Sequence, residues 1–120
     1  MKDLDALQGA WDIIKLTVEG SLLPPAFYTG AQIIVKDATF TTKAMGAVYE
    51  GDVTIDESAS PRTFDLKFTS GPEKGNLSLG IYELDGDDWR VCLGFAGKSR
   101  PTAFESKPGT GHALEELKRA

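Results

Sequence analysis

One ten-residue segment, residues 47–56, constrains the fold of this chain more than any other. Every second side chain in it is apolar or small, namely Ala47, Tyr49, Gly51, Val53 and Ile55. The side chains between them are mostly polar or acidic. Because successive side chains of a strand point to opposite faces, this alternation predicts an antiparallel strand with one face buried and one face in solvent. Such a strand needs partner strands that share its core.

The rest of the chain supplies those partners. Segments that alternate, or that are rich in β-branched and aromatic residues, are separated by turn-forming residues. The predicted strands cover residues 11–19, 31–36, 38–43, 47–56, 63–69, 76–84, 88–96 and 112–119. The strongest turn signal is Asp85-Gly86, which favours a two-residue hairpin loop. For the last segment a terminal helix is the alternative, because Ala-Leu-Glu-Glu-Leu-Lys has high helix propensity.

Four shorter features complete the predicted elements. Residues 3–8 predict a helical turn, and residues 26–30 predict a short helix or a lid loop. A break is expected at residues 44–46, and a short strand around residues 102–105.

Short strands at close, regular spacing indicate a sandwich or a barrel. The up-and-down order with short hairpins favours the barrel, which also leaves no exposed strand edge. We therefore predict an all-β fold, a single antiparallel up-and-down β-barrel of about eight strands that occupies residues 1–120 as one domain. A length of 120 residues, with 41% hydrophobic and 26% charged residues, is typical of one globular domain.

The predicted hairpin at Asp85-Gly86 contains a conflict of parity. Tyr82 and Trp89 face each other on one side of the hairpin, whereas Leu79 and Ile81 have the opposite parity. Either both faces of the hairpin are covered, or a bulge intervenes. We expect a kink at Gly80, because glycine tolerates bulge geometry and stands where the parity changes.

Charge and cysteine content exclude several classes of protein. The net charge of −5, without a clustered basic surface, argues against nucleic-acid binding. Cys92 is the only cysteine, so an intrachain disulfide is impossible. No apolar run approaches the ~20 residues of a membrane-spanning helix. Without a signal peptide at the N-terminus, a cytoplasmic location is the default expectation, and a secreted form trimmed before residue 1 remains the alternative. The sequence predicts no oligomeric state.

The start of the first strand, Gly9-Ala10-Trp11, resembles the Gly-x-Trp motif of lipocalins and their calycin relatives. In that family the Trp plugs the closed end of the barrel, and a basic residue of the last strand packs on its ring. The resemblance therefore implies structural roles for Gly9 and Trp11, with Arg119 (or Lys118) in a cation–π contact.

A second resemblance spans nearly the whole chain. It is similar to a family of bacterial domains abundant in planctomycetes, whose biochemical activity is not established. The stretches that carry it are residues 7–11, 80–87, 97–104, 107–109 and 117–119. This resemblance implies a lipocalin-like fold and supplies no catalytic residue. One departure is Trp89, where that family usually has an aliphatic residue, and it puts the free interior volume in question.

The candidate ligand site is the barrel interior. Its expected lining is aromatic, with Arg100 at the mouth to meet an anionic head group. The candidate residues are Phe40, Tyr49, Phe68, Tyr82, Trp89 and Arg100. This lining favours a lipocalin-like module that binds a small apolar or amphipathic ligand. The same rings could instead fill the core of a non-enzymatic structural or protein-interaction module.

No catalytic or metal-binding constellation emerges. His112 is the only histidine, so a hydrolase or isomerase that uses it ranks last among the hypotheses. Cys92 alternates with apolar residues and is interpreted as a small hydrophobic side chain. The carboxylates near Asp85-Gly86 are explained by the hairpin turn, since calcium loops need more ligands at spaced positions. We expect no enzymatic activity, no cofactor and no metal.

Overall fold

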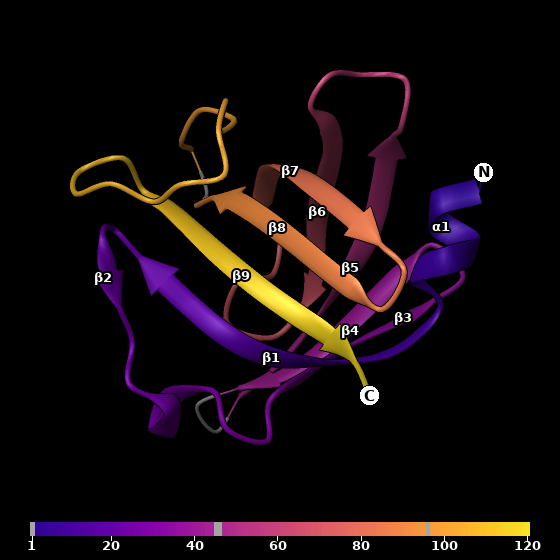
Figure 1. The fold of residues 1–120 in the computed structure, drawn as a ribbon, viewed down its shortest axis with the longest axis horizontal. Coiled ribbons are helices and arrows are strands. Elements are labelled where there is room, and N and C mark those ends of the chain that lie inside the picture. The colour runs from indigo at the N-terminus through magenta and orange to yellow at the C-terminus, as the bar shows by residue number, and fades with distance from the viewer. Residues whose placement is uncertain (1, 45–46, 96) are drawn as a thin grey trace.

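Strands make up most of this fold (Figure 1). The computed structural model describes residues 2–44, 47–95 and 97–120, so most of the expected break at residues 44–46 lies outside the described residues. The elements are α1 (Lys2–Leu7), β1 (Gly9–Val18), β2 (Ser21–Leu22), the short 3-10 helix η1 (Pro25–Phe27), β3 (Gln32–Lys36), β4 (Thr39–Ala44), β5 (Ala47–Asp56), β6 (Arg62–Ser70), β7 (Leu77–Asp85), β8 (Asp88–Gly94) and β9 (His112–Arg119).

All strand pairings are antiparallel, and the sheet closes on itself. The sheet order is β2-β1-β3-β4-β5-β6-β7-β8-β9, and β1 also pairs with β9. Trp11 shows the closure directly, since it lies opposite Ile33 of β3 on one side and Arg119 of β9 on the other. β2 adds only two residues beside β1. The structure is therefore the predicted all-β barrel, with eight strands in the ring and β2 as an extra strand.

The alternation predicted for the central strands is confirmed. In β5 the buried residues are Gly51, Val53 and Ile55, and the residues between them are exposed. In β6 the inward Phe64, Leu66 and Phe68 are all buried. From Gly51 to Asp56 the two strands pair without a register shift, so their apolar side chains meet on one face and form part of the core.

One prediction at the C-terminal end is confirmed and another is wrong. Residues 112–119 form strand β9 as predicted, and the helical alternative for this segment is excluded. The reason is that β9 pairs along its whole length with β8 and with β1, and this pairing overrides the helix propensity of the segment. The short strand expected around residues 102–105 is also wrong, since these residues form bends within the β8–β9 loop.

The kink expected at Gly80 is wrong, and the other solution to the parity conflict is correct. The pairing of β7 with β6 and with β8 runs through Gly80 without a register shift. Instead, both faces of the hairpin are covered. Ile81 and Cys92 point outward yet are 1% and 0% exposed, because the β8–β9 loop folds over them and buries Pro101.

Arg100 clamps that loop to the outside of the sheet. Its guanidinium donates to both carboxylate oxygens of Asp65, at 2.6 and 3.1 Å, and to the carbonyl oxygen of Gly80 at 2.7 Å. A two-pronged charge-assisted pair of this kind fixes both position and direction. The β8–β9 loop therefore forms a second, smaller layer of packing on the outer face of β6 and β7.

The helix α1 covers one end of the barrel, beside the turns that join β3 to β4, β5 to β6 and β7 to β8 (Figure 1). Its contacts tie it to these turns. Asp3 accepts hydrogen bonds from Arg62 and from the Tyr82 hydroxyl, both at 2.7 Å. Gln8 exchanges two hydrogen bonds with the backbone of Asp37. This end of the barrel is closed.

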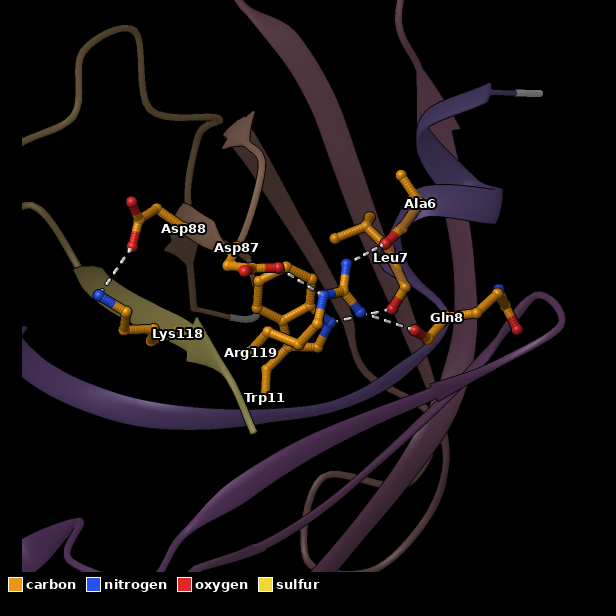
Figure 2. A network of polar contacts seen from close by, with 8 residues as sticks. All are labelled: Ala6, Leu7, Gln8, Trp11, Asp87, Asp88, Lys118 and Arg119. Carbon is orange, nitrogen blue, oxygen red and sulfur yellow. Dashed lines mark hydrogen bonds and ion pairs between the residues drawn. The ribbon is translucent and has the colours of Figure 1, made fainter.

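Trp11 and Arg119 form the centre of the closed end (Figure 2). Trp11 is fully buried, and its indole N–H donates to the carbonyl oxygen of Leu7 at 2.9 Å. The Arg119 guanidinium lies 4.3 Å from the centre of the Trp11 ring. It also donates to the carbonyl oxygens of Ala6 and Gln8, at 2.6 and 3.1 Å. One cation thus joins the last strand to the first strand and to the end of α1.

Arg119→Met should lower the free energy of unfolding by roughly 1–3 kcal/mol, because it leaves two helix-end carbonyls without their donor and removes the cation from the indole ring. Lys118→Met is the matched control, since Lys118 is exposed and makes a long ion pair of 3.9 Å with the exposed Asp88. This substitution should change stability by less than about 0.5 kcal/mol. Urea denaturation measures both. Equal stability of the two variants would contradict this account of the closed end.

Gly80→Ala should destabilise the barrel by on the order of 2 kcal/mol, because overpacking a tight site forces backbone shifts. A Cβ at this position would lie 2.8 Å from the carbonyl oxygens of Phe64 and Cys92. Ser78→Ala, on the same face of the same strand, adds no atom and serves as the control. Thermal unfolding followed by circular dichroism distinguishes them, and an unchanged melting temperature for Gly80→Ala would refute the tight packing.

Candidate functional site

The barrel interior contains a cavity of about 250 Å³. It lies toward the end opposite α1, since its border includes Glu73 of the β6–β7 loop and Phe95 just after β8. The lining residues are Ile33, Phe40, Thr42, Tyr49, Phe64, Leu66, Phe68, Glu73, Ser78, Trp89, Val91, Leu93, Phe95, Ala113 and Glu115. Side chains therefore do not fill the barrel completely at this end.

Aromatic rings form the floor of the cavity. Trp89 packs edge-to-face against Trp11 at 5.4 Å and against Phe64 at 5.5 Å, measured between ring centres. Phe64 in turn contacts Tyr82 at 6.3 Å. Edge-to-face packing at these distances is favourable beyond the burial of area. These four rings pack together at the closed end of the barrel, below the cavity.

Three more rings form one wall of the cavity. Phe68 of β6 lies 5.8 Å from Phe40 of β4 and 6.4 Å from Tyr49 of β5, with planes inclined at 73° and 67°. The steep inclination is edge-to-face packing, so the three rings hold one another in place. This wall of the cavity is therefore aromatic.

The opposite wall carries a carboxylate, that of Glu115. In the ring of eight strands, β9 lies four strands from β5 in either direction. Glu115 and the aromatic wall therefore lie on opposite sides of the barrel. Figure 1 shows β9 in the foreground, with β5 and β6 behind it. Glu115 pairs with Val91 of β8 and Leu16 of β1. It points inward because it has the same parity as Ala113 and Leu117, which are both buried.

Burial alone raises the pKa of Glu115 to about 7, with no hydrogen bond or neighbouring charge contributing. The side chain keeps some accessible surface because it borders the cavity. An isolated carboxylate in apolar surroundings is costly, so the group either binds a proton or needs a partner. In the described part of the chain it has none. Among the described residues, Glu115 is therefore the carboxyl group on the cavity lining whose pKa is clearly shifted.

A second polar group near the floor also lacks a partner. The indole Nε1 of Trp89 is buried without a hydrogen-bond acceptor among the described residues. Thr42, by contrast, donates to the carbonyl oxygen of Gln32 at 2.7 Å. Buried polar groups are almost always paired, so an orphaned donor beside a cavity calls for an explanation.

Four of the six residues predicted to line a ligand site do border the cavity, namely Phe40, Tyr49, Phe68 and Trp89. Tyr82 does not, because its hydroxyl donates to Asp3 at the closed end and Arg62 lies 5.0 Å from its ring centre. Burial and this hydrogen bond to Asp3 raise the pKa of the phenol well above its usual value. Arg100 was expected at the mouth and lies instead on the outside of the sheet, paired with Asp65.

The sequence-based prediction for residues 112–119 concerned only strand against helix and did not include Glu115 among the candidate site residues. The signal was present in the sequence, since Ala113, Glu115 and Leu117 share one parity within a predicted strand. A carboxyl between two apolar residues on an inward face is the pattern of a functional or strained position. Only the register of β9 shows which face is inward.

The remaining candidates have structural contacts. A ring nitrogen of His112 lies 3.0 Å from the carbonyl oxygen of Ser99, within the β8–β9 loop contacts. Cys92 is buried under that loop, and burial raises the pKa of its thiol to about 11, which opposes thiolate formation. Asp87 pairs with Arg119 at 3.1 Å. No cluster of three or more metal-ligating side chains occurs among the described residues.

Comparison with known proteins adds no assignment, since no family model, curated protein or solved structure matches this chain. Within the described ranges, no helix has the length and apolar character required to cross a membrane.

The stability of Glu115→Gln relative to the wild type should increase as the pH rises. The folded pKa of about 7 exceeds the ordinary value of 4.5, so the unfolded chain releases this proton first. Stability of the wild type is therefore lost as pH rises from 4.5 to 7, and the variant is spared this loss. The advantage of the variant should grow by roughly 1–3 kcal/mol between pH 4 and pH 8.

Urea denaturation at the two pH values measures this change. Glu116→Gln is the control, because its carboxylate lies on the outer face, 3.6 Å from the Lys15 amine. The stability of Glu116→Gln relative to the wild type should not increase between pH 4 and pH 8. A constant difference for Glu115→Gln at both pH values would show that Glu115 is not buried as described.

Proposed function

We propose that this chain is a lipocalin-like binding domain that takes up a small apolar or amphipathic molecule in the open half of its barrel. The observation that carries the proposal is the cavity, which opens at the end of the barrel opposite α1 and is lined mainly by aromatic and aliphatic side chains. Ligand sites typically combine such a lining with a few polar groups that set orientation. Here those groups are Glu115 and the hydroxyls of Thr42, Tyr49 and Ser78.

The start of the barrel supports the same assignment. Trp11 is buried at the closed end and the Arg119 guanidinium lies over its ring, a contact that agrees with the expectation from the Gly-x-Trp resemblance. A plug of this kind leaves the opposite end for entry, and the cavity lies toward that end. The placement among lipocalin-like barrels remains part of the proposal.

The size of the cavity limits the ligand. An apolar cavity of about 150 Å³ accommodates benzene. By proportion, a cavity of about 250 Å³ accommodates a molecule of about ten non-hydrogen atoms. A long-chain fatty acid or a tetrapyrrole is too large without widening of the barrel. The expected ligand is therefore a single small ring with a short polar substituent.

A titration with 2-phenylethanol tests the proposal. Trp89 borders the cavity, so occupancy should change its fluorescence in a saturable way with one site per chain. Ala113→Phe places a ring in the cavity from β9 and should weaken binding at least about tenfold. Val48→Phe adds the same ring to the exposed side of β5 and should leave binding unchanged.

Native mass spectrometry gives a second readout of the one-to-one complex. A failure of 2-phenylethanol and related small arenes, uncharged or charged, to bind the wild type, or equal binding by Ala113→Phe, would rule out the cavity as a binding site.

A further inference from the structure

The charges on the cavity lining are all of one sign. Its charged residues are Glu115 of β9 and Glu73 of the β6–β7 loop, and among the described residues no Lys, Arg or His borders the space. Tyr49 is the other titratable residue on the lining. An anionic ligand would meet two carboxylates and no cation to pair with. The lining therefore disfavours carboxylates and phosphates and favours a positive group.

The aromatic wall favours an apolar or aromatic body on the same ligand. Phe40, Tyr49 and Phe68 form a set of steeply inclined rings across the barrel from Glu115. An aromatic ring of a ligand packs favourably against such rings. A carboxylate on one side of the cavity and aromatic rings on the other form the arrangement that holds an amine together with its apolar body.

We propose that the ligand of this cavity is a small amphipathic amine, bound as the ammonium ion with its charge on the Glu115 carboxylate and its apolar body against the aromatic wall. This inference rests on the proposed function, since it names the ligand class of the same site. The match is to a primary arylalkylammonium of about ten non-hydrogen atoms, the size set above. The ammonium supplies the partner that Glu115 lacks within the described residues.

Binding of such a cation is coupled to a proton. The pKa of about 7 means that Glu115 is partly protonated in the empty cavity at neutral pH. A bound ammonium stabilises the ionised carboxylate and lowers this pKa. Complex formation at pH 7 should therefore release roughly half a proton per ligand. A ligand that accepts a hydrogen bond from the protonated acid would cause proton uptake instead.

The test compares three probes of similar size and shape, namely 2-phenylethylammonium, 2-phenylethanol and phenylacetate. Calorimetric titrations at pH 7, in two buffers of different ionisation enthalpy, give affinity and proton release together. We expect the ammonium to bind at least about tenfold more tightly than the alcohol, and the carboxylate not to bind. Proton release should accompany the ammonium alone.

Glu115→Gln is the decisive variant, because it keeps the shape of the side chain and removes the charge. It should reduce ammonium binding to about the level of the alcohol and abolish proton release. Glu116→Gln removes one charge from the adjacent outer-facing residue and should behave like wild type. A near-UV circular dichroism spectrum like that of the wild type, and a melting temperature at pH 5 no lower than that of the wild type, show that Glu115→Gln retains the folded barrel.

The outcomes separate this inference from the proposed function. Equal or stronger binding of the alcohol or the carboxylate, or full ammonium affinity in Glu115→Gln, would overturn the amine ligand and leave the binding cavity intact. Absence of binding by all three probes would overturn both.

Discussion

The pairing of β1 with β9 is the interaction on which the rest of this structure depends. It joins the two ends of the sequence, closes the sheet and leaves the ring without an unpaired edge. Arg119 reinforces the closure, because its guanidinium lies on the Trp11 ring and bonds the backbone at the end of α1. The pairing of β1 with β9 costs chain entropy, because the two strands are far apart in the sequence. Burial of the Trp11 ring and its contact with the Arg119 guanidinium offset part of this cost.

The closed end also determines where the barrel is empty. Four aromatic rings around Trp11 and Trp89 occupy the half of the interior near α1. A barrel of eight strands can be filled by its side chains or can hold one small ligand. Here both tryptophans pack with Phe64 and Tyr82 at the closed end, and the cavity lies toward the other end.

Glu115 is the feature of this cavity that stability alone does not explain. An unpartnered carboxyl on an inward face weakens the fold at neutral pH, since its pKa of about 7 reflects burial and no compensating contact. Natural sequences place such groups mainly at sites that bind or react. The outer Arg100–Asp65 pair is the contrast, because there each charge has a close partner and the role is to hold a loop.

The sequence by itself determined the fold class, most strand positions and four of the aromatic residues that line the cavity, because alternation with period two and the Asp85-Gly86 turn are local properties. It also indicated the Trp11 plug through a resemblance. The coverage of Ile81 and Cys92 by the β8–β9 loop, the place of Arg100 outside the barrel and the inward position of Glu115 were decided only by the tertiary structure. Each depends on register and on packing between segments far apart in the chain, and a one-residue change in register would turn every side chain of a strand to the other face.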